Sequence, residues 1–263
     1  MFPLKDNIPR ERLPLVSIAL ILANVIVYLL EIRHGGSFFG GPSDSVVVHY
    51  GAIPYQLTHL GKHCGLLTTQ TLAGLSRTVA CQGQPGASGV PPSALPAWMT
   101  AFTAMFLHAN FLHIFGNMLF LGIFGPNVEE ALGRPRFVCF YLLGGLVALA
   151  GQVAFDPSST APTIGASGAI AAVLGGYILL YPRARVLTLV LIVFFFTLVE
   201  LPALVLLGLW FAEQLYFAAA GLTDPVGTGG TVAYFAHIGG FLFGLALVGL
   251  FTKRGGLSRL SIH

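Results

Sequence analysis

The sequence is poor in charged residues and in cysteine. Only 9% of its 263 residues are Asp, Glu, Lys or Arg, whereas 55% are hydrophobic, and there are three cysteines. A soluble domain carries roughly a quarter charged residues, so the composition excludes an ordinary soluble protein. The net charge of +3 gives no reason to expect a nucleic acid partner. The composition is instead that of a membrane protein.

Six apolar runs are candidate transmembrane helices, since crossing the ~30 Å hydrocarbon core takes about 20 residues. The runs cover about residues 14–32, 101–124, 137–155, 167–181, 202–221 and 232–251. They predict an all-α, six-helix membrane domain over residues 14–252, preceded by a segment of residues 1–13 and followed by a tail of residues 253–263. The first run ends at Glu31 without a small-residue cleavage site, so we expect it to stay as an anchor.

A seventh apolar run, residues 186–199, is shorter than the others and lies between Pro182 and Pro202. A run of this length is more typical of a re-entrant or interfacial segment than of a span. We therefore expect it to touch the bilayer without crossing it.

The basic residues are distributed unevenly between the two sides that these spans define. One side holds only Arg33, Lys62 and Arg77. The opposite side holds the other ten of the thirteen Lys and Arg residues: Lys5, Arg10, Arg12, Arg134, Arg136, Arg183, Arg185, Lys253, Arg254 and Arg259. Because basic residues are retained on the cytoplasmic side, both termini are predicted to be cytoplasmic.

The segment of residues 34–97 then falls outside as the only sizeable soluble portion. It carries Cys64 and Cys81 in the compartment where disulfides persist, which makes them a candidate disulfide. His59 and His63 could alternatively join these cysteines in a metal site. No CxxC or HExxH spacing supports a metal, so we expect a plain surface loop. Cys139, in the third run, is interpreted as a small buried apolar residue.

Polar side chains within the second run form the first candidate for function, because such residues are costly at bilayer depth. In "FLHANFLHIFGNMLF" His113 and Asn117 are four residues apart and share a helix face, with His108 upstream and displaced around the axis. Hydrogen bonding between helices would explain them equally well.

Ser167 begins the fourth run and supplies the second candidate; it lies within "TIGASGAIAAVLGGY", residues 163–177. A helix over residues 167–181 would be roughly 22 Å long, too short for the hydrocarbon core. Its start is therefore expected to be sunk below the outer surface, where unpaired backbone N–H groups would suit an oxyanion. Ser167 could be the helix N-cap or a nucleophile, and the local sequence does not choose.

Small residues give the fourth and sixth runs matching faces, and His237 lies beside one of them. The residues are Gly168, Ala171, Ala172 and Gly175 in the fourth run, and Gly240 and Gly244 in the sixth. If these faces pack together, His237 comes level with Ser167 and can serve as its base. The sequence then holds a nucleophile, a base and oxyanion donors, which together indicate acyl transfer.

Three ordered motifs resemble those of the rhomboid family of intramembrane serine proteases: "HANFLHIFGN", "GASG" and "AHIGGFLFG". The resemblance implies a dyad of Ser167 and His237, with His113 and Asn117 holding the oxyanion and His108 in a supporting role. It also implies close packing at Gly165 and the other motif glycines, no cofactor or metal, and single-span or multi-span membrane proteins as substrates. We expect the cell membrane of a bacterium as the location.

The chain departs from common rhomboid features at three positions and keeps one more. "NVEEALG" resembles the family's acidic loop motif, in which Glu129 would support the loop structure, but Ala131 stands where a basic residue often follows. Trp98 is followed by Met99 rather than Arg. Ala171 replaces a Tyr that stacks on the histidine in some members, so we expect His237 to be oriented by helix packing alone.

Three alternatives remain open on the sequence. Glu213, in the fifth run, could complete a triad, although lining a wet cavity or bonding to a neighbouring helix is the stronger interpretation. A catalytically silent rhomboid-like scaffold would typically lack Ser167 or His237, and this chain keeps both. A small proton-linked transporter would predict an inverted repeat, which the sequence does not show.

Overall fold

The computed structural model describes residues 2–71, 74–85, 87–90, 95–192, 195–223 and 232–252. The expected C-terminal tail of residues 253–263 lies outside this part of the chain. The chain divides into two compact units. Unit 1 comprises Met1–Leu22, Phe115–Gly151 and Ser167–His263, and unit 2 comprises Ala23–Ile114 and Gln152–Ala166. Three helices contribute residues to both: α1 (Leu15–Arg33), α5 (Phe111–Leu132) and α6 (Arg134–Phe155).

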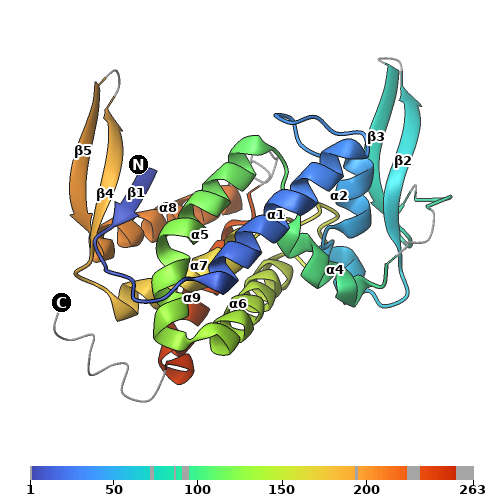
Figure 1. The fold of residues 1–263 in the computed structure, drawn as a ribbon. Helices are drawn as coiled ribbons and strands as arrows, with labels where there is room; N and C mark the ends of the chain where they lie inside the picture. Colours follow the sequence, from blue (N-terminus) through green and yellow to red (C-terminus); the bar gives the residue numbers. More distant parts are fainter. Residues whose placement is uncertain are drawn as a thin grey trace. The chain divides into compact units, whose positions relative to one another are not determined.

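Helix α7 (Ser167–Leu180) forms the core of unit 1, and α8 (Ala203–Thr223) and α9 (Tyr234–Phe251) pack against it (Figure 1). Nearly every α7 residue after Ser167 is buried. A helix that is apolar all round is expected inside a bundle rather than on its surface. The short fourth run therefore marks the centre of this unit.

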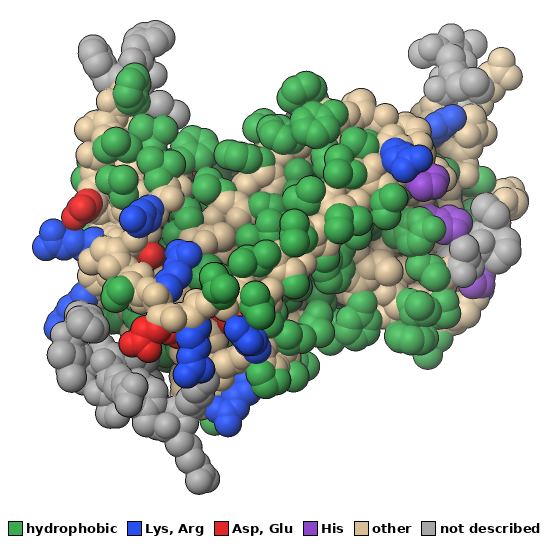
Figure 2. Space-filling view, in the orientation of Figure 1, with side chains coloured by type: hydrophobic (Ala, Val, Ile, Leu, Met, Phe, Trp, Pro, Cys, Tyr) green, Lys and Arg blue, Asp and Glu red, His purple; other side chains and the backbone are tan. Residues whose placement is uncertain are grey.

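Five helices are long and apolar enough to cross a membrane, within the described part of the chain: α1, α5, α6, α8 and α9. The 14-residue α7 falls short of that length, so six full spans are not confirmed. The visible helix surface in Figure 2 is largely hydrophobic, as a lipid-facing surface should be. On α1 the exposed apolar side chains include Ile18, Leu22, Val25, Ile26 and Leu29.

The second predicted span is displaced toward the C-terminus relative to its apolar run. Helix α4 (Ala97–Thr103) and a 3₁₀ turn, η1 (Ala104–Phe106), precede α5, which begins only at Phe111. The side-chain oxygen of Asn110 accepts the backbone N–H of His113 at 2.9 Å, a helix N-cap contact. This cap explains why the helix starts later than the apolar composition suggested.

Strands in unit 1 show that the all-α prediction was wrong and that the chain is mostly helical. Strands β1 (Phe2–Asp6), β4 (Arg185–Ile192) and β5 (Phe195–Pro202) form an antiparallel sheet in the order β1-β4-β5. The run expected to be re-entrant or interfacial is thus a hairpin that pairs with the N-terminal segment. Its β-branched and aromatic residues suit strands, and pairing satisfies backbone groups that a short apolar loop would leave open.

Asp6 anchors the N-terminal strand to the helices of unit 1. Its buried carboxylate accepts hydrogen bonds from the Asn127 amide and from the Tyr177 hydroxyl, the latter at 2.8 Å, and Arg10 lies 3.9 Å away. Burial raises the pKa of this carboxyl, and the three partners oppose that rise. The N-terminal segment is therefore an integral part of unit 1.

Unit 2 contains secondary structure where a plain surface loop was expected. Helices α2 (Asp44–Tyr50) and α3 (Pro54–Thr58) pack near a hairpin of β2 (Cys64–Thr71) and β3 (Gly74–Cys81). Cys64 and Cys81 face each other in the strand register and form a disulfide. Together with Val48, Ile53 and Tyr55 they make a small buried core.

The other expectations for cysteine and histidine have different outcomes. The described ranges contain no group of three or more His, Cys, Asp or Glu side chains arranged to hold a metal ion. The ring of His59 instead stacks on Tyr55, with centroids 4.0 Å apart. Cys139 is exposed on α6 rather than buried, because its side chain lies on the outer surface of that helix.

Candidate active site

Ser167 and His237 meet where α7 and α9 begin. The Ser167 Oγ lies 2.8 Å from Nε2 of His237, within hydrogen-bond distance. Ser167 is the first residue of α7, and His237 lies in the first turn of α9. Both side chains are half-buried. This is the separation that a hydroxyl nucleophile and its general base require.

Glycine residues allow the backbones of α7 and α9 to touch near this pair. A Cβ added at Gly240 would collide with the carbonyl oxygen of Gly168, and one added at Gly244 would collide with that of Ala172. From the other helix, a Cβ at Gly175 would strike the carbonyl oxygen of Phe241. Because a main-chain oxygen cannot rotate away as a side chain can, these positions require glycine at the observed helix separation.

Gln214, on α8, holds the other nitrogen of the His237 ring. Its Oε1 lies 2.7 Å from Nδ1, and its Nε2 donates to the carbonyl oxygen of Trp210 at 3.3 Å. The Trp210 ring lies beside the imidazole, with centroids 5.8 Å apart at an interplanar angle of 37°. The expectation that helix packing alone orients His237 was therefore wrong.

Gln214 was not predicted from the sequence, because its neighbour Glu213 is the charged residue of the fifth run. Glu213 is exposed, whereas Gln214 is only 5% exposed. The sequence did contain one signal. Gln214 is the one amide of the fifth run, and it shares a helix face with Trp210, four residues earlier. A buried amide in a membrane helix needs a partner, and here the partner is His237.

His108 and His113 belong to unit 2. His108 is fully buried in the segment between η1 and α5, rather than within a helix as expected, and its ring lies 5.1 Å from that of His113. Nδ1 of His113 accepts the backbone N–H of Ala109 at 3.3 Å. An imidazole that accepts at Nδ1 carries its proton on Nε2, so His113 is left with a donor. Gly165, also in unit 2, adopts a left-handed backbone with φ of +120°.

Asn117 belongs to unit 1 and lies on α5. It is 8% exposed, and its Nδ2 has no hydrogen-bond partner among the described residues. Buried amide donors are nearly always paired in proteins, so this amide can donate a further hydrogen bond.

The chain matches the family description "Rhomboid domain" over residues 96–254, which is more than half of its length. It belongs to the rhomboid family. It is 32% identical over 164 residues to rhomboid-like protein 11, chloroplastic, of Arabidopsis thaliana, covering 60% of this chain and 54% of the relative. It is 33% identical over 81 residues to the putative rhomboid protease YdcA of Bacillus subtilis, covering 31% of this chain and 40% of the relative.

A further relative is rhomboid protein 1, mitochondrial, of Saccharomyces cerevisiae, at 32% identity over 146 residues, which covers 53% of this chain and 38% of the relative. The chain thus spans about half or less of the length of these curated relatives. The rhomboid domain and the five membrane-capable helices together make this a multi-pass membrane protein.

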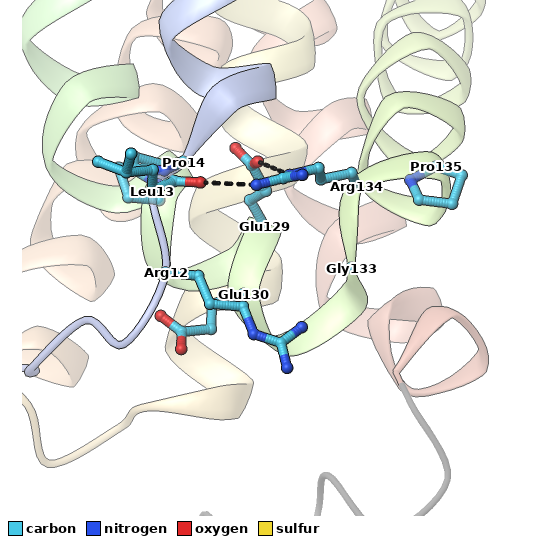
Figure 3. A pocket seen from close by; sticks show the side chains of 9 residues that line it. Arg12, Leu13, Pro14, Glu129, Glu130, Gly133, Arg134 and Pro135 are labelled. Carbon is cyan, nitrogen blue, oxygen red and sulfur yellow. Dashed lines mark hydrogen bonds and ion pairs between the residues drawn. The ribbon is translucent and has the colours of Figure 1, made fainter.

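Glu129 holds the start of α1 in this rhomboid. Its carboxylate accepts the backbone N–H of Val16 at 3.0 Å, and the N–H and hydroxyl of Ser17 at 2.8 Å each. Arg134 lies 4.0 Å from the same carboxylate and donates to the carbonyl oxygen of Leu13 (Figure 3). These contacts satisfy N–H groups that a helix N-terminus leaves unpaired, so Glu129 stabilises the start of α1.

Proposed function

We propose that this rhomboid is an intramembrane serine endopeptidase, with Ser167 as nucleophile and His237 as general base. The observation that carries the proposal is the 2.8 Å contact between Ser167 Oγ and His237 Nε2. An amide oxygen can only accept a hydrogen bond, so the contact with Gln214 leaves the proton on Nδ1. Nε2 then has a free electron pair directed at the serine hydroxyl.

The reaction follows from this arrangement. Nε2 takes the hydroxyl proton as Oγ attacks the peptide carbonyl carbon, which forms the C–O bond and places negative charge on the carbonyl oxygen. His237 then donates the proton to the leaving amine as the C–N bond breaks. Water, deprotonated by the same nitrogen, attacks the acyl-enzyme ester, releases the carboxylate product and restores Ser167.

Three donors are proposed to stabilise the oxyanion. They are the backbone N–H of Ser167 at the start of α7, Nε2–H of His113, and the amide of Asn117. The tautomer assigned to His113 and the unpaired Nδ2 of Asn117 support these roles. Pre-positioned donors of this kind are worth about 10²- to 10³-fold each in kcat.

The position of the site in the membrane is part of the proposal. At 1.5 Å per residue, the 14 residues of α7 reach about 21 Å, less than the ~30 Å hydrocarbon core. We place Ser167 below the outer surface, both termini in the cytoplasm and the protein in a bacterial cell membrane. Single-span or multi-span membrane proteins would be its substrates, and the small-residue faces and basic residues support this topology.

Cleavage of a single-span substrate by purified protein in liposomes tests the activity. Ser167→Ala and His237→Ala should each abolish cleavage, whereas Ser158→Ala, which changes an exposed serine, should leave it unchanged. A fluorophosphonate probe should label wild type at Ser167 and fail to label His237→Ala. Undiminished cleavage by Ser167→Ala would overturn the proposal.

A further inference from the structure

We propose that Gln214 is the positioning residue of the general base, an inference that rests on the proposed protease function. It bonds the nitrogen of His237 that faces away from Ser167, and it does so from a third helix, α8. Through this contact the ring is restrained at both nitrogens. Gln214 does not touch Ser167 or the substrate bond and acts only through His237.

The orientation of the Gln214 amide is fixed by its second hydrogen bond. Its Nε2 donates to the carbonyl oxygen of Trp210, one helical turn earlier on α8. The other end of the amide, the oxygen, therefore faces His237 and can only accept. A flipped amide would place an N–H against Nδ1 and break the Trp210 contact. The side chain thus selects the tautomer in which Nε2 can receive the Ser167 proton.

The aromatic neighbours of His237 leave its tautomer open. Trp210 contacts the ring at a tilt rather than by parallel stacking. An aromatic contact of this kind limits the ring position without setting its tautomer. Gln214 supplies the directional contact.

A neutral orienting group predicts a particular pH behaviour. Among the described residues, Tyr234 on α9 places its titratable side chain beside the imidazole, with ring centroids 6.5 Å apart, and Glu213 on α8 is exposed. From α7 the facing group is the Ser167 hydroxyl. A carboxylate in place of the Gln214 amide would keep the acceptor but add a negative charge that favours the protonated imidazole. His237 would then act as a base only at higher pH.

The experiment compares Gln214→Ala, Gln214→Glu and wild type by measuring kcat and KM across pH, with the single-span substrate in proteoliposomes. Gln214→Ala should lower kcat by about 10- to 100-fold with little change in KM, since a misaligned base loses rate rather than binding. Gln214→Glu should recover activity at alkaline pH, with its acid limb moved up by about one pH unit or more.

Glu213→Gln is the matched control, because it makes the reverse change at the neighbouring exposed position. Its profile should match wild type. A wild-type kcat in Gln214→Ala, or a Gln214→Glu profile that superimposes on wild type, would overturn the positioning role, and the second result stands even if the alanine variant misfolds. If wild type neither cleaves nor labels at Ser167, the protease proposal itself has failed.

Discussion

Replacing Gly240 with alanine is expected to pull His237 away from Ser167 without altering any proposed catalytic side chain. Gly240 lies one turn after His237 on α9 and packs against Gly168, the residue after Ser167. The new Cβ would overlap the carbonyl oxygen of Gly168, and it would also lie 3.3 Å from the Ala148 Cβ. Neither backbone can yield locally, so the helices must separate.

The size of this separation sets the size of the effect. A carbon and a carbonyl oxygen make close contact at about 3.3 Å, so relieving the overlap takes a shift on the order of 1 Å. The same shift would stretch the 2.8 Å contact between Ser167 and His237 beyond ordinary hydrogen-bond length. A 1 Å misplacement can reduce the rate about 10²-fold, and we expect a loss of that order in kcat.

Gly249→Ala provides the matched control, because a Cβ at this position on α9 meets nothing within 4 Å. Both substitutions raise intrinsic helix propensity by about 1 kcal/mol, so propensity cannot explain a difference between them. Cleavage and fluorophosphonate labelling should fall for Gly240→Ala and stay at wild-type levels for Gly249→Ala. Equal activity in the two variants would refute the view that main-chain contact sets the Ser–His distance.

Three further predictions concern stability and thiols. Glu129→Ala should lower the thermal unfolding temperature, because it leaves three hydrogen-bond donors unpaired and each costs about 1–3 kcal/mol of unfolding free energy. Glu129→Gln should recover part of this loss. Labelling with a maleimide mass tag should detect one thiol, Cys139, before reduction and three thiols afterwards. Reducing the Cys64–Cys81 disulfide, whose cysteines are 17 positions apart, should lower the unfolding free energy by about 3 kcal/mol. Because burial raises the pKa of Asp6, the unfolding free energy in detergent should fall as pH rises from about 4 through that pKa, and Asp6→Asn should flatten the dependence. An Asp6→Asn curve parallel to wild type, a three-thiol count before reduction, or an unchanged unfolding temperature in Glu129→Ala would contradict these expectations.

The sequence predicts a helix well where an uninterrupted apolar run sets both of its ends. The first run was placed at residues 14–32 and the helix spans Leu15–Arg33, since nothing within the run interrupts it. The hairpin of β4 and β5 was missed because its strands are as apolar as a membrane segment. Strand β4 also pairs with β1, more than 170 residues earlier in the chain, and a local pattern does not contain that information.

Within the candidate site, predictability followed the packing of α7 and α9. The small-residue faces on those helices suggested that Ser167 and His237 meet, because glycine spacing encodes close approach. Gln214 has no such signature. Its contact with His237 depends on how α8 is rotated against α9, which is decided by large side chains such as Phe211 and Phe241 that stack 4.4 Å apart.

The contact between the α7 and α9 backbones also bears on how the protein would respond to its lipid. Main-chain atoms deform far less than side chains, so a thicker or thinner bilayer would tilt the two helices together rather than spread them. The Ser167–His237 distance should then persist across membranes of different thickness. Gln214 comes from α8, which lacks such a glycine contact. A change in lipid composition would therefore alter the contact between Gln214 and His237, and with it the tautomer of His237, before it alters the Ser167–His237 distance.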